Sequence, residues 1–205
     1  DYDFAIPSMQ SIWYGRTEML FGEKAEREAL LAYTKDAIEF AGALRCGNLV
    51  FGCPRNRNMP EGVCENDAVD FFRQIGDYAA EREMRIGLEA NPPIYHTNFI
   101  NTTKQALEYI EVVGSEGIKL NLDMGTMIQN GENVDVIRGS VPQISHVHIS
   151  EPGLKMICER GLLDELLEVL KEENYQGFVS IEMAKPEKLS DVWSVMEMVS
   201  SKIKV

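Results

Sequence analysis

The sequence predicts an α/β protein in which helices surround a parallel β-sheet. Six short apolar runs alternate along the 205 residues with helical patterns, and no linker rich in Pro, Gly or Ser interrupts them. The runs are almost continuously apolar, which is typical of strands buried on both faces of a parallel sheet. Parallel strands joined through helices require right-handed crossovers. We therefore expect one domain over residues 1–205. The expected strands lie at 4–13, 48–53, 85–90, 118–123, 144–150 and 178–183.

The segments between these runs have the spacing of amphipathic helices. Apolar residues in them recur at intervals of three and four, which places them on one face of a helix. Asn101 or Thr102 is suited to cap the third helix, and Gly114 stands where that helix should end. After residue 123, "NVDVIRGS" allows only about two turns of helix. The other expected helices lie at 25–45, 66–80, 102–113, 162–171 and 188–202.

The composition argues against several classes of partner. The net charge is −13, so nucleic acid and anionic membranes would be repelled. No apolar run reaches the roughly 18 residues of a transmembrane helix, and the N-terminus does not resemble a signal peptide. Cys46, Cys53, Cys64 and Cys158 form no CxxC pair, which indicates reduced thiols in a cytoplasmic protein. We expect a small-molecule partner and leave a homo-oligomer open.

Four consecutive apolar runs end in an ionisable residue: Glu89, Asp123, His148 and Glu182, here called the quartet. The intervals are 34, 25 and 34 residues, about one βα unit each. Residues at equivalent heights on parallel strands converge at one rim of a barrel. One carboxylate at a strand end is more often a helix cap or a solvated loop residue, but three carboxylates and one histidine at consecutive strand ends favour a shared site. No GxGxxG or Walker loop follows a strand, so an open nucleotide-binding sheet has little support.

Three carboxylates brought together repel one another unless a cation joins them. The quartet therefore predicts a site for one divalent metal ion, Mn²⁺ or Mg²⁺ first, with Co²⁺ or Zn²⁺ as alternatives. His146 and His148 stand at positions i and i+2 of a strand and point to the same side. His148 is nearer the carboxyl end and is the ligand candidate. His146 lies deeper, and we expect it to pack or hydrogen-bond behind the ligands.

The ordered quartet resembles the xylose-isomerase-like TIM-barrel superfamily, in particular its sugar phosphate isomerase/epimerase members. Six segments also resemble sequences of that family: "IPSMQSIWYGR", "NLVFGCPRNR", "GLEANP", "IKLNLDMGT", "HVHISEP" and "VSIEM". The resemblance implies a TIM-barrel-like (β/α) barrel and one metal ion held by the quartet. It also implies a sugar or sugar-phosphate isomerase or epimerase that works through an enediolate, with Glu89 and Glu182 as the acid/base pair.

Three departures from the family pattern qualify this expectation. Family barrels have eight βα units, whereas this sequence matches the last six, and residues 4–13 resemble the third strand. The first two units are then missing, so the chain is either a fragment or an incomplete barrel whose edges a partner covers. Epimerases often carry a substrate-binding histidine where Thr126 stands. They also often place an arginine after the histidine strand, where this chain has Leu154 and Lys155.

Weaker candidates for substrate contacts lie at or just beyond strand ends. Arg55 and Arg57 would suit a phosphate, with a pair of solvated loop residues as the alternative. Trp13 and Tyr14 could form a wall against a sugar, although packing in the core is at least as plausible. Cys53 is not expected to be a nucleophile, because no histidine is assigned beside it. The predicted substrate contacts are Gln10, Arg55, Arg57, Asn91 and Lys155.

Other functions remain open at this stage. A dehydratase or a hydroxypyruvate-isomerase-like enzyme of the same fold would reuse the metal and the proton abstraction. An endonuclease of the endonuclease IV type needs three zinc ions and a basic face, which three histidines and a charge of −13 do not favour. A barrel remnant without catalytic activity is the remaining alternative.

Overall fold

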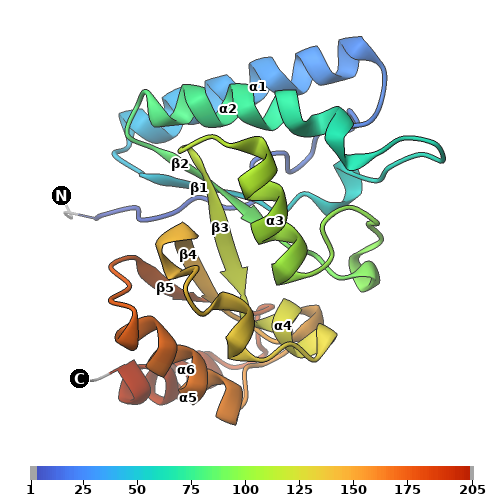
Figure 1. The fold of residues 1–205 in the computed structure, drawn as a ribbon. Helices are drawn as coiled ribbons and strands as arrows, with labels where there is room; N and C mark the ends of the chain where they lie inside the picture. The colour runs from blue at the N-terminus through green and yellow to red at the C-terminus, as the bar shows by residue number, and fades with distance from the viewer. Residues whose placement is uncertain (1–3, 204–205) are drawn as a thin grey trace.

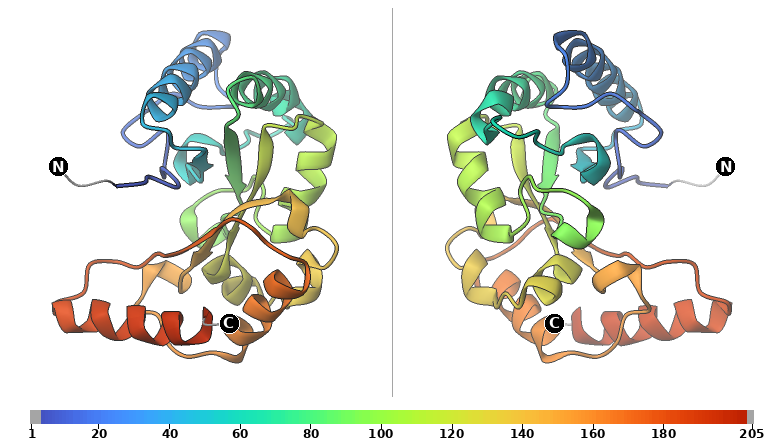
Figure 2. Two further views of the ribbon diagram at one scale, coloured as in Figure 1. Left: turned by 90° about the vertical axis from the view of Figure 1, so that its left-hand side faces the viewer. Right: turned by 90° about the vertical axis from the view of Figure 1, so that its right-hand side faces the viewer.

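The structure, a computed structural model, describes residues 4–203 and contains a curled sheet of five parallel strands with helices on its outside (Figures 1 and 2). The strands are β1 (Asn48–Phe51), β2 (Arg85–Glu89), β3 (Ile118–Asp123), β4 (Ile144–Ile149) and β5 (Phe178–Ile181). They pair in sequential order, β1-β2-β3-β4-β5. Sequential parallel order with a helical crossover after each strand is the arrangement of a (β/α) barrel.

The helices cover the convex side of the sheet. They are α1 (Lys24–Ala43), α2 (Val69–Ala80), α3 (Thr103–Val113), α4 (Met124–Asn130), α5 (Gly161–Glu172) and α6 (Leu189–Ile203). Figure 1 shows α1 and α2 at one end of the molecule and α5 and α6 at the other. Among residues 4–203, no helix combines the length and the apolar character needed to cross a bilayer.

Aromatic side chains fill the core between the first strands and their helices. Phe51 of β1 meets Trp13 edge-on at 4.6 Å and Phe72 of α2 at 5.0 Å, and Phe99 meets Tyr109 of α3 at 5.2 Å. All five side chains are almost completely buried. Edge-to-face contacts are a favoured packing of aromatic rings, so this cluster fixes the positions of α2 and α3 against the sheet.

The strand predicted at 4–13 does not form. Only Met9 makes a bridge, parallel to Leu49 of β1, with its N–H donating to the carbonyl of Asn48 over 3.0 Å. Pro7 has no N–H to donate to a ladder, and Ser11 has φ 55°, which lies outside the extended region. The segment therefore runs beside β1 (Figure 1) as an irregular edge, and five of the six predicted strands are present.

The helix expected after residue 123 forms earlier than the sequence suggested. It begins directly at Met124 because the Asp123 side chain accepts a hydrogen bond from the N–H of Thr126 over 2.6 Å and caps α4. "NVDVIRGS" forms only a 3₁₀ turn at Val134–Ile137. The predicted ends of α3 are confirmed, since Thr102 caps its N-terminus and Gly114, at φ 64°, ends it.

Candidate metal centre

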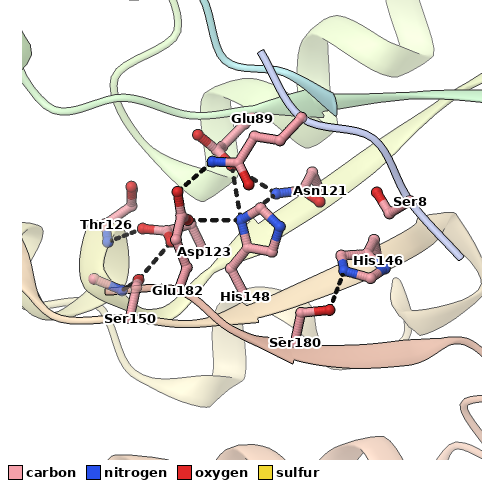
Figure 3. A network of polar contacts seen from close by, with 12 residues as sticks. Ser8, Glu89, Asn121, Asp123, Thr126, His146, His148, Ser150, Ser180 and Glu182 are labelled. Atoms are coloured by element: carbon pink, nitrogen blue, oxygen red, sulfur yellow. Dashed lines mark hydrogen bonds and ion pairs between the residues drawn. The ribbon is translucent and has the colours of Figure 1, made fainter. Parts of the chain in front are cut away.

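The four residues of the quartet meet at the carboxyl ends of the strands (Figure 3). Each offers one ligand atom, and these atoms lie within 4.8 Å of one another. Nδ1 of His148 is 2.9 Å from Oε2 of Glu182 and 3.2 Å from Oε2 of Glu89. Parallel pairing explains the convergence, because it aligns Asp123 with His148 across β3 and β4 and brings all four strand ends to one rim.

Burial and mutual repulsion shape the ionisation of the quartet. Burial, followed by the charge of Glu89, raises the pKa of Asp123 to about 7. Burial acts to lower the pKa of His148, but hydrogen bonds to Glu182 and Glu89 outweigh it and raise that pKa to about 10. Burial alone would raise the pKa of Glu182, yet the bond to His148 and its charge hold it below its usual value. The imidazolium is thus the one positive charge within the quartet.

The quartet fits a divalent cation. Three carboxylate oxygens and one imidazole nitrogen form an oxygen-rich set of the kind that Mg²⁺ and Mn²⁺ accept. One imidazolium cannot neutralise three buried carboxylates, and the raised pKa of Asp123 reflects that deficit of positive charge. The side-chain oxygens of Asn91 and Asn121 are also buried without a hydrogen-bond partner among the described residues. A doubly charged ion would supply the positive charge that the site lacks.

Neighbouring amides orient the two glutamates in the same way. Glu89 directs Oε2 toward His148 and accepts from the Asn91 amide at Oε1 over 3.0 Å. Glu182 directs Oε2 toward His148 and accepts from the Gln10 amide at Oε1. Two of the predicted substrate contacts, Gln10 and Asn91, therefore hold the second oxygen of a glutamate in this structure.

Asn121 and Ser150 also hold the quartet, and neither residue was predicted from the sequence. The Asn121 amide donates to Oε2 of Glu89 over 2.7 Å, and the Ser150 hydroxyl donates to Oδ2 of Asp123 over 2.5 Å. Each stands two positions from a quartet residue along the chain, so that strand alternation places it on the same face. This spacing was the signal that could have found them.

The two histidines of β4 have different surroundings. Nε2 of His146 is 2.9 Å from the Ser180 hydroxyl, and its ring lies edge-on to that of His148 at 5.2 Å. Burial, followed by the charge of His148, lowers the pKa of His146 to about 4. His146 is therefore neutral and lies deeper in the sheet than the four converging atoms (Figure 3).

The prediction that Arg57 contacts a substrate is wrong. Arg57 is fully buried, and its guanidinium donates to the main-chain carbonyls of Glu89 over 2.9 Å and Ile100 over 3.4 Å. Arg55, two positions earlier, is exposed. The pattern of charges in "CPRNR" does not reveal which arginine turns inward, because that depends on how the short helix Pro54–Asn56 meets β2.

The remaining candidates divide between core and surface. Trp13 belongs to the core, where its indole N–H donates to the Thr34 hydroxyl over 2.8 Å, whereas Tyr14 is 90% exposed. Lys155 and His96 are exposed. Thr126 is buried, and its hydroxyl donates to the carbonyl of Ala90 over 2.9 Å. It therefore joins α4 to the end of β2.

Comparison with known proteins places this geometry in a family. Residues 4–196 match the model of the xylose isomerase-like TIM barrel. The chain is 28% identical over 118 residues to D-psicose 3-epimerase of Enterocloster bolteae, a match that covers 56% of this chain and 38% of that protein. It is 31% identical over 141 residues to inosose isomerase of Halalkalibacterium halodurans, covering 60% and 48%. The chain thus spans less than half the length of these curated relatives.

Solved structures share the fold at lower sequence identity. A 3-keto-D-glucoside 4-epimerase from E. coli superposes with a TM-score of 0.76 at 17% identity, covering 95% of this chain and 78% of that one. D-psicose 3-epimerase from Clostridium cellulolyticum superposes with a TM-score of 0.74 at 14% identity, covering 92% and 75%. Because the family model matches residues 4–196, nearly the whole chain, the chain belongs to the xylose isomerase-like TIM barrel family.

Proposed function

We propose that this chain carries the catalytic centre of a divalent-metal-dependent isomerase or epimerase that acts on a sugar or sugar phosphate. The observation that carries the proposal is the convergence of the quartet within 4.8 Å at the carboxyl rim of the sheet. The curated relatives, which include a sugar epimerase and an inosose isomerase, support this class of reaction. The metal ligands are Glu89, Asp123, His148 and Glu182.

Glu89 and Glu182 are suited to move a proton between two faces of a substrate. They come from β2 and from the end of β5, and they approach His148 from separate strands. One glutamate would take the carbon-bound proton and the other would return one. A divalent ion bound by the quartet would polarise the carbonyl and neighbouring hydroxyl of a ketose and stabilise the resulting enediolate.

The residues around the glutamates favour this division of labour. Gln10 and Asn91 each hold one carboxylate oxygen in place, so that neither glutamate can rotate freely. Such positioning keeps the reacting oxygen within reach of the substrate proton. Return of the proton to the opposite face gives an epimer, whereas return to the neighbouring carbon gives an aldose–ketose isomer. Both outcomes belong to the proposal.

Dehydration is a second candidate reaction for the same centre. It is supported by similarity to the inosose dehydratase of Clostridium botulinum, which is 25% identical over 138 residues. A three-zinc endonuclease has less support. Among residues 4–203, the quartet is the one cluster of three or more ligating side chains.

The test combines metal analysis with solvent deuterium exchange. We expect the purified chain to hold one divalent ion and to incorporate deuterium from D₂O into a ketose. Glu182→Gln should slow that exchange by about 100-fold or more, as expected for the loss of a general base. Glu187→Gln is the matched control, because Glu187 is exposed and makes no contact with the quartet. Full exchange in Glu182→Gln, or folded protein with neither metal nor exchange, would refute the proposal.

A further inference from the structure

A cavity of about 560 Å³, here called the rim cavity, lies between the loop that begins at Ser11 and the segment Cys53–Asn56. Gln10, which bonds Glu182, is followed directly by Ser11 in one wall. A side chain on Gly52 would have its Cβ 3.0 Å from Oε1 of Glu89, and Gly52 is followed directly by Cys53 in the other wall. In both segments the lining of the rim cavity thus begins one residue after a residue that lies close to a proposed acid/base glutamate.

One arginine of the rim cavity, Arg55, has no charged partner among the described residues. Two arginines line it, and Arg16 is paired with Glu18. Arg55 is exposed and makes no hydrogen bond or ion pair with any residue in 4–203. In a chain of net charge −13, carboxylates greatly outnumber cations. A guanidinium that remains unpaired beside a cavity is therefore available to an anion.

The walls of the rim cavity are held in place before any ligand binds. The buried Asn56 amide donates to the carbonyl of Arg16 over 3.1 Å and to that of Glu18 over 2.9 Å. The Asn56 carbonyl accepts from the N–H of Leu20 over 2.7 Å. These bonds join the loop after Ser11 to the short helix that carries Arg55. A preformed site loses less conformational entropy on binding than a flexible one.

We propose that the rim cavity binds the phosphate group of a phosphorylated ketose, with Arg55 as its ligand. This inference rests on the proposed function and names its substrate class. A guanidinium pairs with phosphate through two parallel hydrogen bonds, and the cavity volume lies within the range of small-molecule sites. A ketose with its reacting carbons at the quartet carries a terminal phosphate several bonds away. A three-carbon keto acid has its carboxylate on the carbonyl carbon and carries no anionic group several bonds away.

The first experiment measures binding without catalysis. Inorganic phosphate is titrated into the full chain and into Arg55→Gln by isothermal calorimetry. We expect the substitution to weaken phosphate binding by about 10- to 100-fold, the range for lost hydrogen bonds to a charged group. Arg45→Gln is the matched control, because Arg45 is an exposed arginine that lines a different cavity. It should bind phosphate as the parent chain does. Equal phosphate binding by Arg55→Gln and the parent would overturn the inference.

The second experiment compares deuterium exchange into a ketose, its terminal phosphate ester and hydroxypyruvate. Arg55→Gln should lower kcat/KM for the ester by about 10- to 100-fold more than it lowers kcat/KM for the ketose. An equal loss on ketose and ester, or a comparable loss on hydroxypyruvate, would overturn the phosphate assignment while the proposed function stands. Absence of exchange with every substrate would instead refute the proposed function, and the phosphate titration would still decide the role of Arg55.

Discussion

Arg57 shows how a buried cation can support a site without entering it. Its guanidinium lies 5.8 Å from the ring centre of Phe51 and 6.0 Å from that of Phe99, with no exposure to solvent. Burial lowers its pKa to about 10, so it stays charged at neutral pH. By donating to the carbonyls of Glu89 and Ile100 it connects the end of β2 to the loop that follows. Aromatic faces and carbonyl oxygens replace part of the water that the guanidinium loses, while its Nε has no hydrogen-bond partner among the described residues.

We expect Arg57→Met to destabilise the fold. It would remove the charged donor of two carbonyl oxygens, although the Ile100 carbonyl keeps its bond from the N–H of Asn91. A hydrogen bond to a charged group contributes about 1.5–3 kcal/mol, so the free energy of unfolding should fall by about 2–4 kcal/mol. Arg55→Met should change it by less than about 0.5 kcal/mol, as is usual for an exposed position. Urea denaturation of both variants checks this. Equal stability of the two would show that the buried contacts contribute little.

The cysteines provide a second prediction for individual residues. Burial raises the pKa of the Cys53 thiol to about 11, whereas Cys64 is exposed. The thiolate is the reactive form, so iodoacetamide at neutral pH should modify Cys64 first and leave Cys53 intact until the chain unfolds. Peptide mass spectrometry resolves the sites. Cys158 is also exposed, but a hydrogen bond to Glu151 raises its pKa, so it should follow Cys64. Rapid modification of Cys53 in folded protein would contradict the packing around β1.

At the scale of elements, strands and helices differ in what the sequence reveals. The runs at 85–90, 118–123 and 144–150 predicted β2, β3 and β4 to within one residue, because a strand covered on both faces needs unbroken apolar character. The run at 4–13 has that character, but Pro7 has no N–H to donate and Ser11 leaves the extended conformation, so only one bridge forms, at Met9. The start of α4 depends on the hydrogen bond between Asp123 and Thr126, which hydrophobic periodicity does not report.

The two edges of the sheet should differ in protection. β1 is fully buried and is also hydrogen-bonded to Met9, whose main-chain carbonyl accepts from the N–H of Val50 over 2.7 Å. β5 pairs only with β4 among the described residues and is partly exposed, with Phe178 58% exposed. Amide exchange is faster where burial and contacts are few. In a hydrogen–deuterium exchange experiment, peptides from β5 should therefore take up deuterium before peptides from β1. The reverse order would contradict this difference between the two edges.

At the scale of the whole molecule, the sequence could locate the quartet because the fold itself performs the assembly. Parallel strands deliver their last residues to one rim, so knowing four strand ends was sufficient. The surroundings were harder to predict, because whether Arg55 or Arg57 turns inward and which amide holds Glu89 depend on packing between segments far apart in the chain. Tertiary structure alone decides that Arg55 is exposed beside the rim cavity and that Arg57 is buried in the core.

A metal ion bound by the quartet, as proposed, would also stabilise the whole chain. A ligand that binds only the folded state adds stability, about 2.7 kcal/mol at a concentration 100 times its Kd. We expect Mn²⁺ or Mg²⁺ to raise Tm and EDTA to reverse the rise. Asp123→Asn should abolish most of this response, because an amide is a weaker ligand than a carboxylate for a hard divalent ion.

The same variant separates a metal site from a merely structural cluster. Without metal, Asp123 is a carboxylate whose charge burial and Glu89 already disfavour, and an asparagine oxygen can still accept the cap bond from Thr126. The Tm of Asp123→Asn in EDTA should therefore be no lower than that of the parent chain, so the two proteins should differ only when metal is added. Differential scanning fluorimetry with and without Mn²⁺ makes the comparison, with Glu187→Gln as the control that keeps the full response. A metal-induced rise in Asp123→Asn equal to that of the parent would place the ion elsewhere.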